Sequence, residues 1–331
     1  MPLEIIIGGV MIASLVLYAL LGGADYGGGV WDLFAFGSRA RRQRALIADA
    51  IGPVWEANHV WLILVVVILF TAFPPAFAVI ATALHIPITL LLIGIVLRGT
   101  AFTFRTYDVQ RDEVQRRWSL VFSIASIITP ILLGTTLGAI ASGTIRVENG
   151  TVTSGFFNSW LAPFPFAVGF FALALFAFLA AVYLTVEAED DRELQEDFRR
   201  RALLAGVAVG VLALTVFVLS GTGAPAVRAG ISRTSWALGL HVLTAIAAVG
   251  AFFTIWTRRY KVARVCVAAQ VTLILLGWAF AQYPNLVEPD LAITAAAAPQ
   301  ITLQLLLGAL VAGALLLFPS YYYLFRIFKA E

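Results

Sequence analysis

Residues Leu161–Val186 read LAPFPFAVGFFALALFAFLAAVYLTV and contain no charged side chain. This run exceeds the roughly 20 residues that a helix needs to cross the hydrocarbon core of a bilayer. A second long run, Leu62–Leu97, also lacks Asp, Glu, Lys and Arg. Membrane barrel strands would instead alternate over roughly ten residues, and only helices or closed barrels satisfy every backbone amide in lipid. These runs therefore predict transmembrane helices.

The composition indicates the same class of protein. Of the 331 residues, 61% are hydrophobic and only 12% are charged, whereas a soluble domain carries about a quarter of charged residues. Too little polar material remains to face water. The net charge of +3 is not gathered on a folded face, so no nucleic-acid partner is expected. We predict an all-α polytopic membrane protein, with its helices arranged as bundles in a single transmembrane domain over 1–331.

Polar, proline and glycine breaks divide the apolar runs into about nine spans. The first run begins at Leu3 with no basic segment before it, so no cleavable signal peptide is expected. The first helix can also continue past its glycines to about residue 36. The predicted spans are 3–24, 47–70, 77–102, 118–141, 162–186, 202–220, 234–256, 262–282 and 302–325.

The distribution of Lys and Arg predicts the orientation of these spans. Four basic residues follow each of the first, third, fifth and seventh spans, and two more lie in the tail, so that eighteen of the 22 gather on one side. The other side holds Arg146, Arg228 and Arg233, and Arg98 lies inside a span. Because cytoplasmic loops are enriched in Lys and Arg, we expect the N-terminus outside and the C-terminus in the cytoplasm.

Cysteine, histidine and methionine are too few for redox chemistry in this chain alone. Cys266 is the single cysteine, which excludes an internal disulfide and a multi-thiolate metal site. Haems in helical bundles take axial histidines or methionines from facing helices, and the chain has only three histidines and two methionines. We expect no cofactor and no metal on this chain, so that a redox role would require a partner that carries the metal.

Charged side chains inside a bilayer cost at least roughly 2.5–3.5 kcal/mol and mark functional sites. At about 1.5 Å of rise per residue, Asp25 should lie near the cytoplasmic side. Glu56 should lie roughly 14 Å inward, close to the midplane, while Arg98 lies near the cytoplasmic end of the third span. The three groups predict a ladder that stops at mid-membrane, as in a half-channel for protons. The alternative is that Arg98 is a structural tie to Asp25 or Glu56.

Two segments surround these charges. In PVWEANHVW at residues 53–61, Glu56 and His59 share one helical face, which makes His59 a further candidate for the path. Asp49 lies nearer the cytoplasmic surface, and it and Asp32 are expected to be solvated. The segment GGADYGGG at residues 22–29 predicts close helix packing, or water binding by freed carbonyls, through five glycines. They are Gly22, Gly23, Gly27, Gly28 and Gly29.

The same segments resemble signatures of subunit II of the cytochrome bd-type quinol oxidases. GGADYGGG resembles the D-[FLY]-G-x-G signature, and IGPVWEANHVWL at residues 51–62 looks like the P-x-W-[DE]-x-N-x-[VT]-W-L motif. LRGTAFTFR at residues 97–105 is similar to F-R-G-x-x-[FY]-[DE]-[FY]-R. The end of the chain also fits, in PNLV at 284–287 and PSYYYLFRIFK at 319–329. The match follows all nine spans in order.

This resemblance implies a multi-pass protein of the bacterial cytoplasmic (inner) membrane. It would be a haem-free subunit that pairs with a subunit I carrying two b haems and one d-type haem. Subunit I would oxidise quinol and reduce oxygen to water without pumping protons. Subunit II would help to line a cytoplasmic proton path. Asp25 matches the acid of the family's first signature, Glu56 the acid of its Trp-Asp/Glu motif, and Arg98 the arginine of its third helix. Quinol is then a substrate at the partner. The resemblance leaves open whether the partner carries b and d haems or b haems only. It also leaves open whether small accessory subunits, lipid or a structural quinone are bound.

Two residues depart from the family pattern. Thr103 stands where members often have an acid five residues after the arginine, and Leu21 stands four residues before the first-span aspartate, where many have another acid. We therefore expect Asp108 or Asp49 to replace these acids at the cytoplasmic mouth of the proton path, or the path to enter through the partner subunit. Two other functions stay open, a proton-coupled membrane transporter and a purely structural membrane scaffold.

Overall fold

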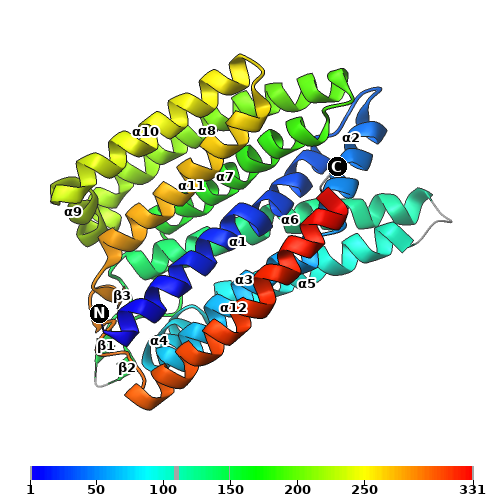
Figure 1. The fold of residues 1–331 in the computed structure, drawn as a ribbon. Helices are drawn as coiled ribbons and strands as arrows, with labels where there is room; N and C mark the ends of the chain where they lie inside the picture. Colours follow the sequence, from blue (N-terminus) through cyan, green and yellow to red (C-terminus); the bar gives the residue numbers. More distant parts are fainter. Residues whose placement is uncertain (1, 108–111, 149, 330–331) are drawn as a thin grey trace.

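The computed structural model describes residues 2–107, 112–148 and 150–329, and nearly all of these form helices (Figure 1). In chain order the elements are α1 (Leu3–Leu33), α2 (Ala40–Ile51), α3 (Trp55–Ala72), α4 (Pro74–Ala83), α5 (His85–Tyr107), α6 (Asp112–Ala141), β1 (Val147–Glu148), β2 (Thr151–Val152), α7 (Pro163–Glu187), α8 (Arg192–Gly223), α9 (Pro225–Arg233), α10 (Ser235–Trp256), α11 (Tyr260–Gln282), β3 (Asn285–Val287), β4 (Leu291–Ala292) and α12 (Gln300–Lys329).

Within the described residues, nine helices are long and apolar enough to cross a membrane. They are α1, α3, α5, α6, α7, α8, α10, α11 and α12, which confirms the predicted number of spans. The two chain termini lie at opposite ends of the bundle (Figure 1). We call the end that carries α2, the turns at 188–191 and 257–259 and the C-terminus the basic end. The opposite end carries α9 and the antiparallel pairs β1–β2 and β3–β4.

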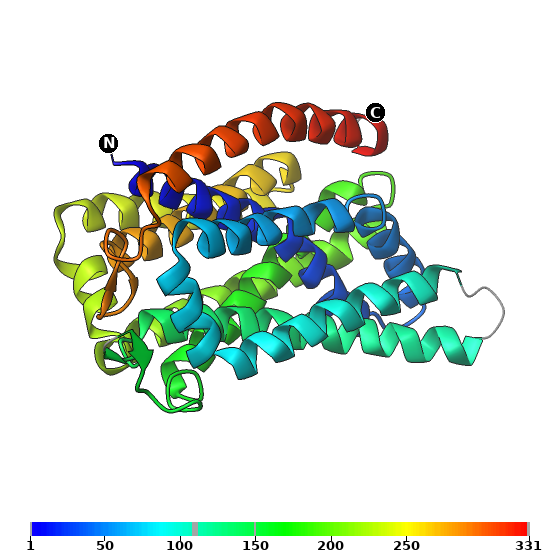
Figure 2. The ribbon, with the colours of Figure 1, turned by 90° about the horizontal axis from the view of Figure 1, so that it is seen from below.

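Two predicted spans are divided in the structure. The predicted span 47–70 separates into α2 and α3 at Gly52-Pro53, so that only α3 crosses. The predicted span 77–102 separates into α4 and α5 at Leu84. Pro87 has no N–H to donate to the carbonyl of Ala83, so a continuous helix would lack that bond. Because α4 is too short to span, it forms a bend at the opposite end between α3 and α5 (Figure 2).

Helix α1 lies at the centre of the bundle and extends to Leu33, near the longer limit expected from the sequence. It packs against α3, α6 and α7. A Cβ on Gly27 would lie 1.9 Å from the carbonyl oxygen of Phe176 on α7, and one on Gly29 would lie 2.1 Å from Oγ of Ser126 on α6. Gly23 faces the Phe176 ring and Gly28 faces Ile51 of α2. Four of the five predicted packing glycines thus allow neighbouring elements to approach, whereas Gly22 faces Tyr18 of its own helix.

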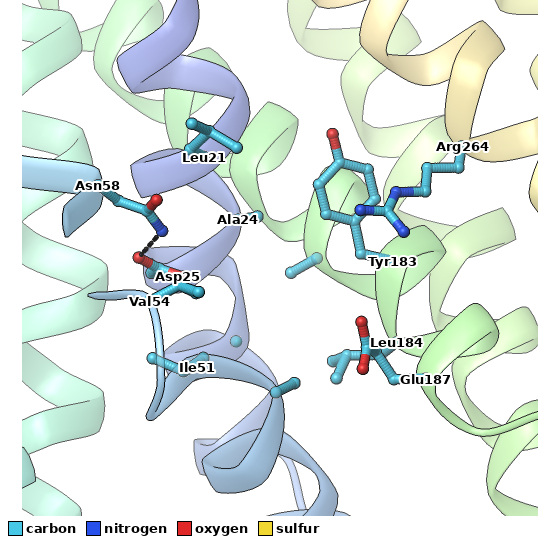
Figure 3. Close-up of a pocket in the computed structure, with 13 residues that line it drawn as sticks. Leu21, Ala24, Asp25, Ile51, Val54, Asn58, Tyr183, Leu184, Glu187 and Arg264 are labelled. Atoms are coloured by element: carbon cyan, nitrogen blue, oxygen red, sulfur yellow. Dashed lines mark hydrogen bonds between the residues drawn. The ribbon is translucent and has the colours of Figure 1, made fainter. Parts of the chain in front are cut away.

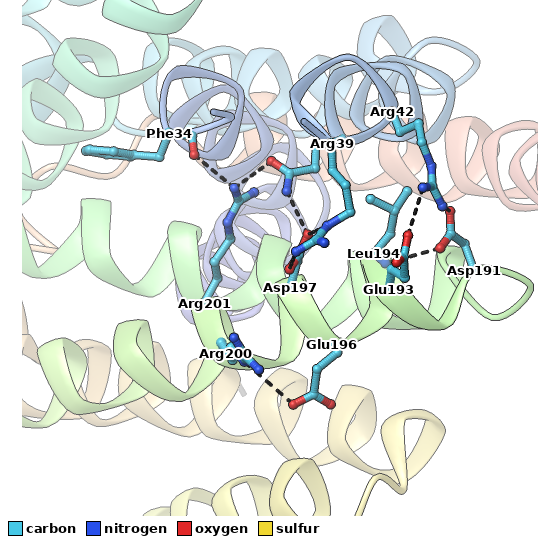
Figure 4. Close-up of polar contacts among 11 residues, drawn as sticks. Phe34, Arg39, Arg42, Asp191, Glu193, Leu194, Glu196, Asp197, Arg200 and Arg201 are labelled. Carbon is cyan, nitrogen blue, oxygen red and sulfur yellow. Dashed lines mark hydrogen bonds and ion pairs between the residues drawn. The ribbon is translucent and has the colours of Figure 1, made fainter. Parts of the chain in front are cut away.

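Polar side chains fasten α2 to the first turns of α8 at the basic end (Figure 4). Arg39 donates hydrogen bonds of 2.8 and 2.7 Å to the two carboxylate oxygens of Asp197. Gln43 donates to Asp197 over 2.8 Å, and Arg201 donates to Oε1 of Gln43 over 2.7 Å. Arg42 pairs with two further acids at the start of α8, Asp191 and Glu193. This network fixes the position of α2, and through Gly52–Val54 it fixes the start of α3.

Candidate proton-transfer site

Asp25 is a buried carboxylate in the middle of the bundle. It lies on α1, eight residues before the helix ends, and is 5% exposed. Nδ2 of Asn58, on the first turn of α3, donates a hydrogen bond of 2.8 Å to Oδ2 of Asp25 (Figure 3). The other amide atom, Oδ1 of Asn58, is buried and has no hydrogen-bond partner in the described structure. The pair therefore presents a carboxylate and a free acceptor in the interior.

Arg98 lies on the neighbouring side of α1. It projects from α5, is 1% exposed, and its Nε lies 3.2 Å from Oγ of Ser126 on α6. Its guanidinium carbon lies 4.7 Å from the centre of the Tyr26 ring and 5.1 Å from that of Phe122. Such contacts with aromatic faces stabilise a desolvated cation by about 2 kcal/mol or more. Nη2 finds no partner among the residues described.

His59 and two tyrosines continue this polar interior. The hydroxyl groups of Tyr18 and Tyr26 lie 3.2 Å apart on α1. The imidazole centre of His59 lies 5.9 Å from the Tyr18 ring, 6.1 Å from the Tyr26 ring and 6.1 Å from the Trp55 ring. Its Nδ1 is buried and unpartnered within the described chain. These groups, with Asp25, Asn58 and Arg98, form the polar cluster of the interior.

Glu56 does not lie where the sequence predicted. It is the second residue of α3, and α3, with 18 residues, extends only about 27 Å. Glu56 therefore lies at the basic end of this span, and the prediction of a midplane position was wrong because α2 and α3 are separate helices. Its side chain is exposed, and residues two apart on a helix do not face each other, so it points away from Asn58 and Asp25. The structure brings Asp25 and Arg98 to the interior and places Glu56 on the outer surface.

The other predicted acids are scattered. Asp49 is exposed on α2. Asp108 lies outside the described residues. Asp32, expected to be solvated, is 1% exposed and accepts a hydrogen bond of 3.1 Å from Ser123, so that expectation was wrong. Thr103 is exposed and donates to the carbonyl of Gly99 on its own helix over 3.0 Å.

A pocket of about 70 Å³ reaches Asp25 and Asn58 from the basic-end half of the bundle. It lies between α1, the link from α2 to α3, α7 and α11, and its far wall carries Tyr183, Glu187 and Arg264 (Figure 3). None of these three residues was predicted from the sequence as part of the site. They lie near the ends of apolar runs, where polar side chains are ordinarily solvated, and only the tertiary arrangement directs them toward Asp25.

The histidines of this chain do not fit a haem held by two of them. His59 lies among Tyr18, Tyr26 and Trp55, as described above. His85 begins α5 at the opposite end, with Nδ1 3.0 Å from the carbonyl oxygen of Thr82. His241 lies on α10 with Nδ1 2.6 Å from the carbonyl oxygen of Ala237. The three described histidines thus occupy three different surroundings.

Known proteins share both the sequence and this fold. The family model for cytochrome bd terminal oxidase subunit II matches residues 3–328. The putative cytochrome bd menaquinol oxidase subunit II of Bacillus subtilis (strain 168) is 22% identical over 323 residues, covering 95% of this chain and 92% of that protein. Cytochrome bd-I ubiquinol oxidase subunit 2 of Escherichia coli (strain K12) is 26% identical over 210 residues, covering 62% of this chain and 53% of that protein.

A solved structure shows the same architecture. The structure of bd oxidase from Geobacillus thermodenitrificans contains a chain that superposes with a TM-score of 0.77 and 23% identity, covering 99% of each chain. The nine apolar helices and the polar interior of α1, α3 and α5 therefore lie in a known membrane fold. This chain belongs to the cytochrome bd terminal oxidase subunit II family, and it is a multi-pass bacterial inner-membrane subunit of an oxidoreductase complex.

Proposed function

We propose that this chain is the haem-free subunit II of a quinol oxidase, that it pairs with a haem-bearing subunit I, and that it carries protons from the cytoplasm toward that partner. The partner would hold the haems, oxidise quinol and reduce oxygen to water. Family membership supports the pairing, and the separate surroundings of the three histidines support the haem-free assignment. The concentration of Lys and Arg at the basic end supports its placement in the cytoplasm.

The observation that carries the proposal is the place of Glu56 on α3. Glu56, Val60, Ile63, Val67 and Phe70 are all exposed and follow one another at intervals of four and three residues. This spacing forms one stripe, which is typical of a helix face that packs against another helix. Glu56 stands at the basic-end start of this stripe, and a partner helix on the stripe would cover its carboxylate and receive its proton. We assign the stripe to subunit I.

The interior cluster supplies the preceding steps. Asp25 and Asn58 lie in the pocket that opens toward the basic end, and Asn58 is two residues from Glu56 on the first turn of α3. A proton on the Asp25 carboxyl group can pass to water beside Asn58, and Glu56, which lies outside this pocket on the exposed face of α3, would take it up at the surface that faces the partner. Arg98, which lies beside Tyr26, supplies a fixed positive charge in the same polar interior. No electron transfer is required of this chain.

The substitution Glu56→Gln in the assembled complex tests the conduit. It keeps the size and the hydrogen-bonding capacity of the side chain but removes the proton acceptor. We expect an unchanged haem absorption spectrum with slower quinol-driven oxygen uptake. Glu148→Gln, an exposed acid of β1 at the opposite end, is the matched control and should leave turnover unchanged. Normal turnover with intact spectra in Glu56→Gln would overturn the conduit and leave a structural scaffold.

A further inference from the structure

The pocket beside Asp25 has the size and the polar groups of a small hydrated inlet. Its volume of about 70 Å³ exceeds the roughly 10–15 Å³ that one water molecule requires. Two buried polar side chains line its inner end, Asp25 and Asn58, which are 5% and 2% exposed. Oδ1 of Asn58 has no hydrogen-bond partner in the part of the chain described. A buried acceptor of this kind is ordinarily satisfied by water.

The outer end of the pocket is polar and reaches the surface. Glu187 is the last residue of α7 and is half-buried, whereas Arg264, five residues into α11, is exposed. The guanidinium carbon of Arg264 lies 4.8 Å from the centre of the Tyr183 ring, so that the two residues form one side of the mouth (Figure 3). The end of α7 and the start of α11 both belong to the basic end of the bundle (Figure 1).

The inner end is limited by an apolar side chain. Leu21 lines the pocket and lies one helical turn from Asp25, on the side toward the opposite end. Glu187 therefore lies at the outer end of the pocket and Asp25 and Asn58 at the inner end, while apolar residues line the rest of its wall and Leu21 lies beyond Asp25. The same pocket contains neither Asp49, which was predicted as an acid of the mouth, nor Thr103, which stands where the family often has an acid.

We propose that this pocket is the cytoplasmic proton inlet of the subunit, with Glu187 as the first carboxylate and Asp25 as the second. The inference rests on the proposed function and names the entrance of that path. Glu187 takes a proton from bulk water, water in the pocket relays it, and Asp25 receives it beside Asn58. Each step moves one proton and no electron. Arg264 places a positive charge at the mouth of the pocket, beside the Tyr183 ring.

Cysteine accessibility tests the inlet without relying on turnover. Because Cys266 is the only cysteine, Cys266→Ser gives a subunit II without thiols. In this background, Ala24→Cys places a thiol in the pocket, and Ala101→Cys places one on α5, where the native side chain is 0% exposed. The assembled complex in inside-out vesicles is treated with an anionic, water-soluble methanethiosulfonate, and labelling is read on the separated subunit II band.

We expect Ala24→Cys to react many-fold faster than Ala101→Cys, and Arg264→Gln to slow the anionic reagent at Ala24→Cys. Equal labelling rates at the two alanine positions would overturn the inlet. If one cysteine variant does not assemble, Ala50→Cys, also in the pocket, replaces Ala24→Cys and is judged by the same comparison.

Turnover tests the role of Glu187. Glu187→Gln should slow oxygen uptake several-fold with an intact haem spectrum, and the slowing should increase as the pH rises and protons become scarce. The matched control is Glu189→Gln, an exposed acid two residues later that pairs with Lys261 over 3.0 Å and lies outside this pocket. Normal turnover in Glu187→Gln, while Glu56→Gln and Asp25→Asn are slow, would overturn the inlet but leave the conduit. Normal turnover in all three would overturn the conduit itself.

Discussion

The guanidinium carbon of Arg98 lies 4.7 Å from the centre of the Tyr26 ring, which joins α5 to α1 at the residue that follows Asp25. The contact is buried, since Arg98 is 1% exposed and Tyr26 is 0% exposed. An arginine so placed is held by a cation–π contact with Tyr26 and by the bond between its Nε and Ser126. The same charge is thus both a tie between helices and a fixed cation beside the proposed path.

Arg98→Lys should lower the stability of the complex although it keeps the charge. A lysine ammonium cannot reproduce both the guanidinium contact with the Tyr26 ring and the Nε bond to Ser126. Leaving a buried polar group without its partner costs about 1–3 kcal/mol. The measurement is the thermal midpoint of haem release from the purified complex, and Arg41→Lys on the exposed face of α2 is the control. Equal midpoints for the two variants would show that the cation–π contact contributes nothing.

Gly27→Ala should separate α1 from α7. The new Cβ would meet the carbonyl oxygen of Phe176 at 1.9 Å, and because that atom belongs to the backbone, one helix must move. Overpacking of this kind costs about 1–3 kcal/mol or more. Gly9→Ala lies on the same helix and has no atom within 4 Å of its new Cβ in the described chain. We expect a lower yield of assembled complex for Gly27→Ala only, measured by size-exclusion chromatography.

Asp197→Asn should loosen α2. The substitution removes the charge that accepts two hydrogen bonds from Arg39 and one from Gln43. Because the Arg39 side chain is 39% exposed, salt screens the pair, and the difference from the native protein should be larger at low than at high ionic strength. Hydrogen exchange over Ala40–Ile51 measures the effect. Unchanged exchange at low salt would show that apolar contacts alone hold this helix.

The loops of the opposite end should loosen in acid through Asp290. The hydrogen bond from Arg146, reinforced by the backbone N–H of Val147, holds the pKa of Asp290 below its ordinary value. This bond therefore contributes stability above the ordinary pKa of about 3.9 and loses it as the pH falls through the lowered value. Hydrogen exchange at Val147, corrected for its intrinsic rate, should rise between about pH 7 and about pH 3. Asp290→Asn should exchange faster at neutral pH and lose this added acid response.

The number of membrane spans could be predicted because the length of an apolar run is a local property. The helix breaks within two of these runs depend on Gly52-Pro53 and Pro87. The sequence shows these residues but does not show that the helix ends at them. A proline near the start of a helix is tolerated and one in its interior is not, so the sequence alone does not say which applies. Assigning the end of α2, from residue 47, to the same span as α3 then placed Glu56 too deep.

The direction of each polar side chain could be predicted only in part. Asp25 and Arg98 are enclosed because glycines draw α6 and α7 toward α1, a tertiary effect that no single segment encodes. Glu187 and Arg264 come together only when the end of α7 meets the start of α11. The orientation of the bundle and the roles of Asp49 and Asp108 stay predictions.

The last span, α12, is the membrane helix that the described chain encloses least. Of the nine described spans, α12 is the least enclosed, with 6% of its most apolar window buried, and contacts such as those of Ala298 with Ala72 and of Tyr321 with Ala57 hold it near its ends. Lipid provides no hydrophobic force that would press it onto its neighbours. In a subunit that stands alone in the bilayer, α12 would therefore be the first of the described spans to separate from the bundle.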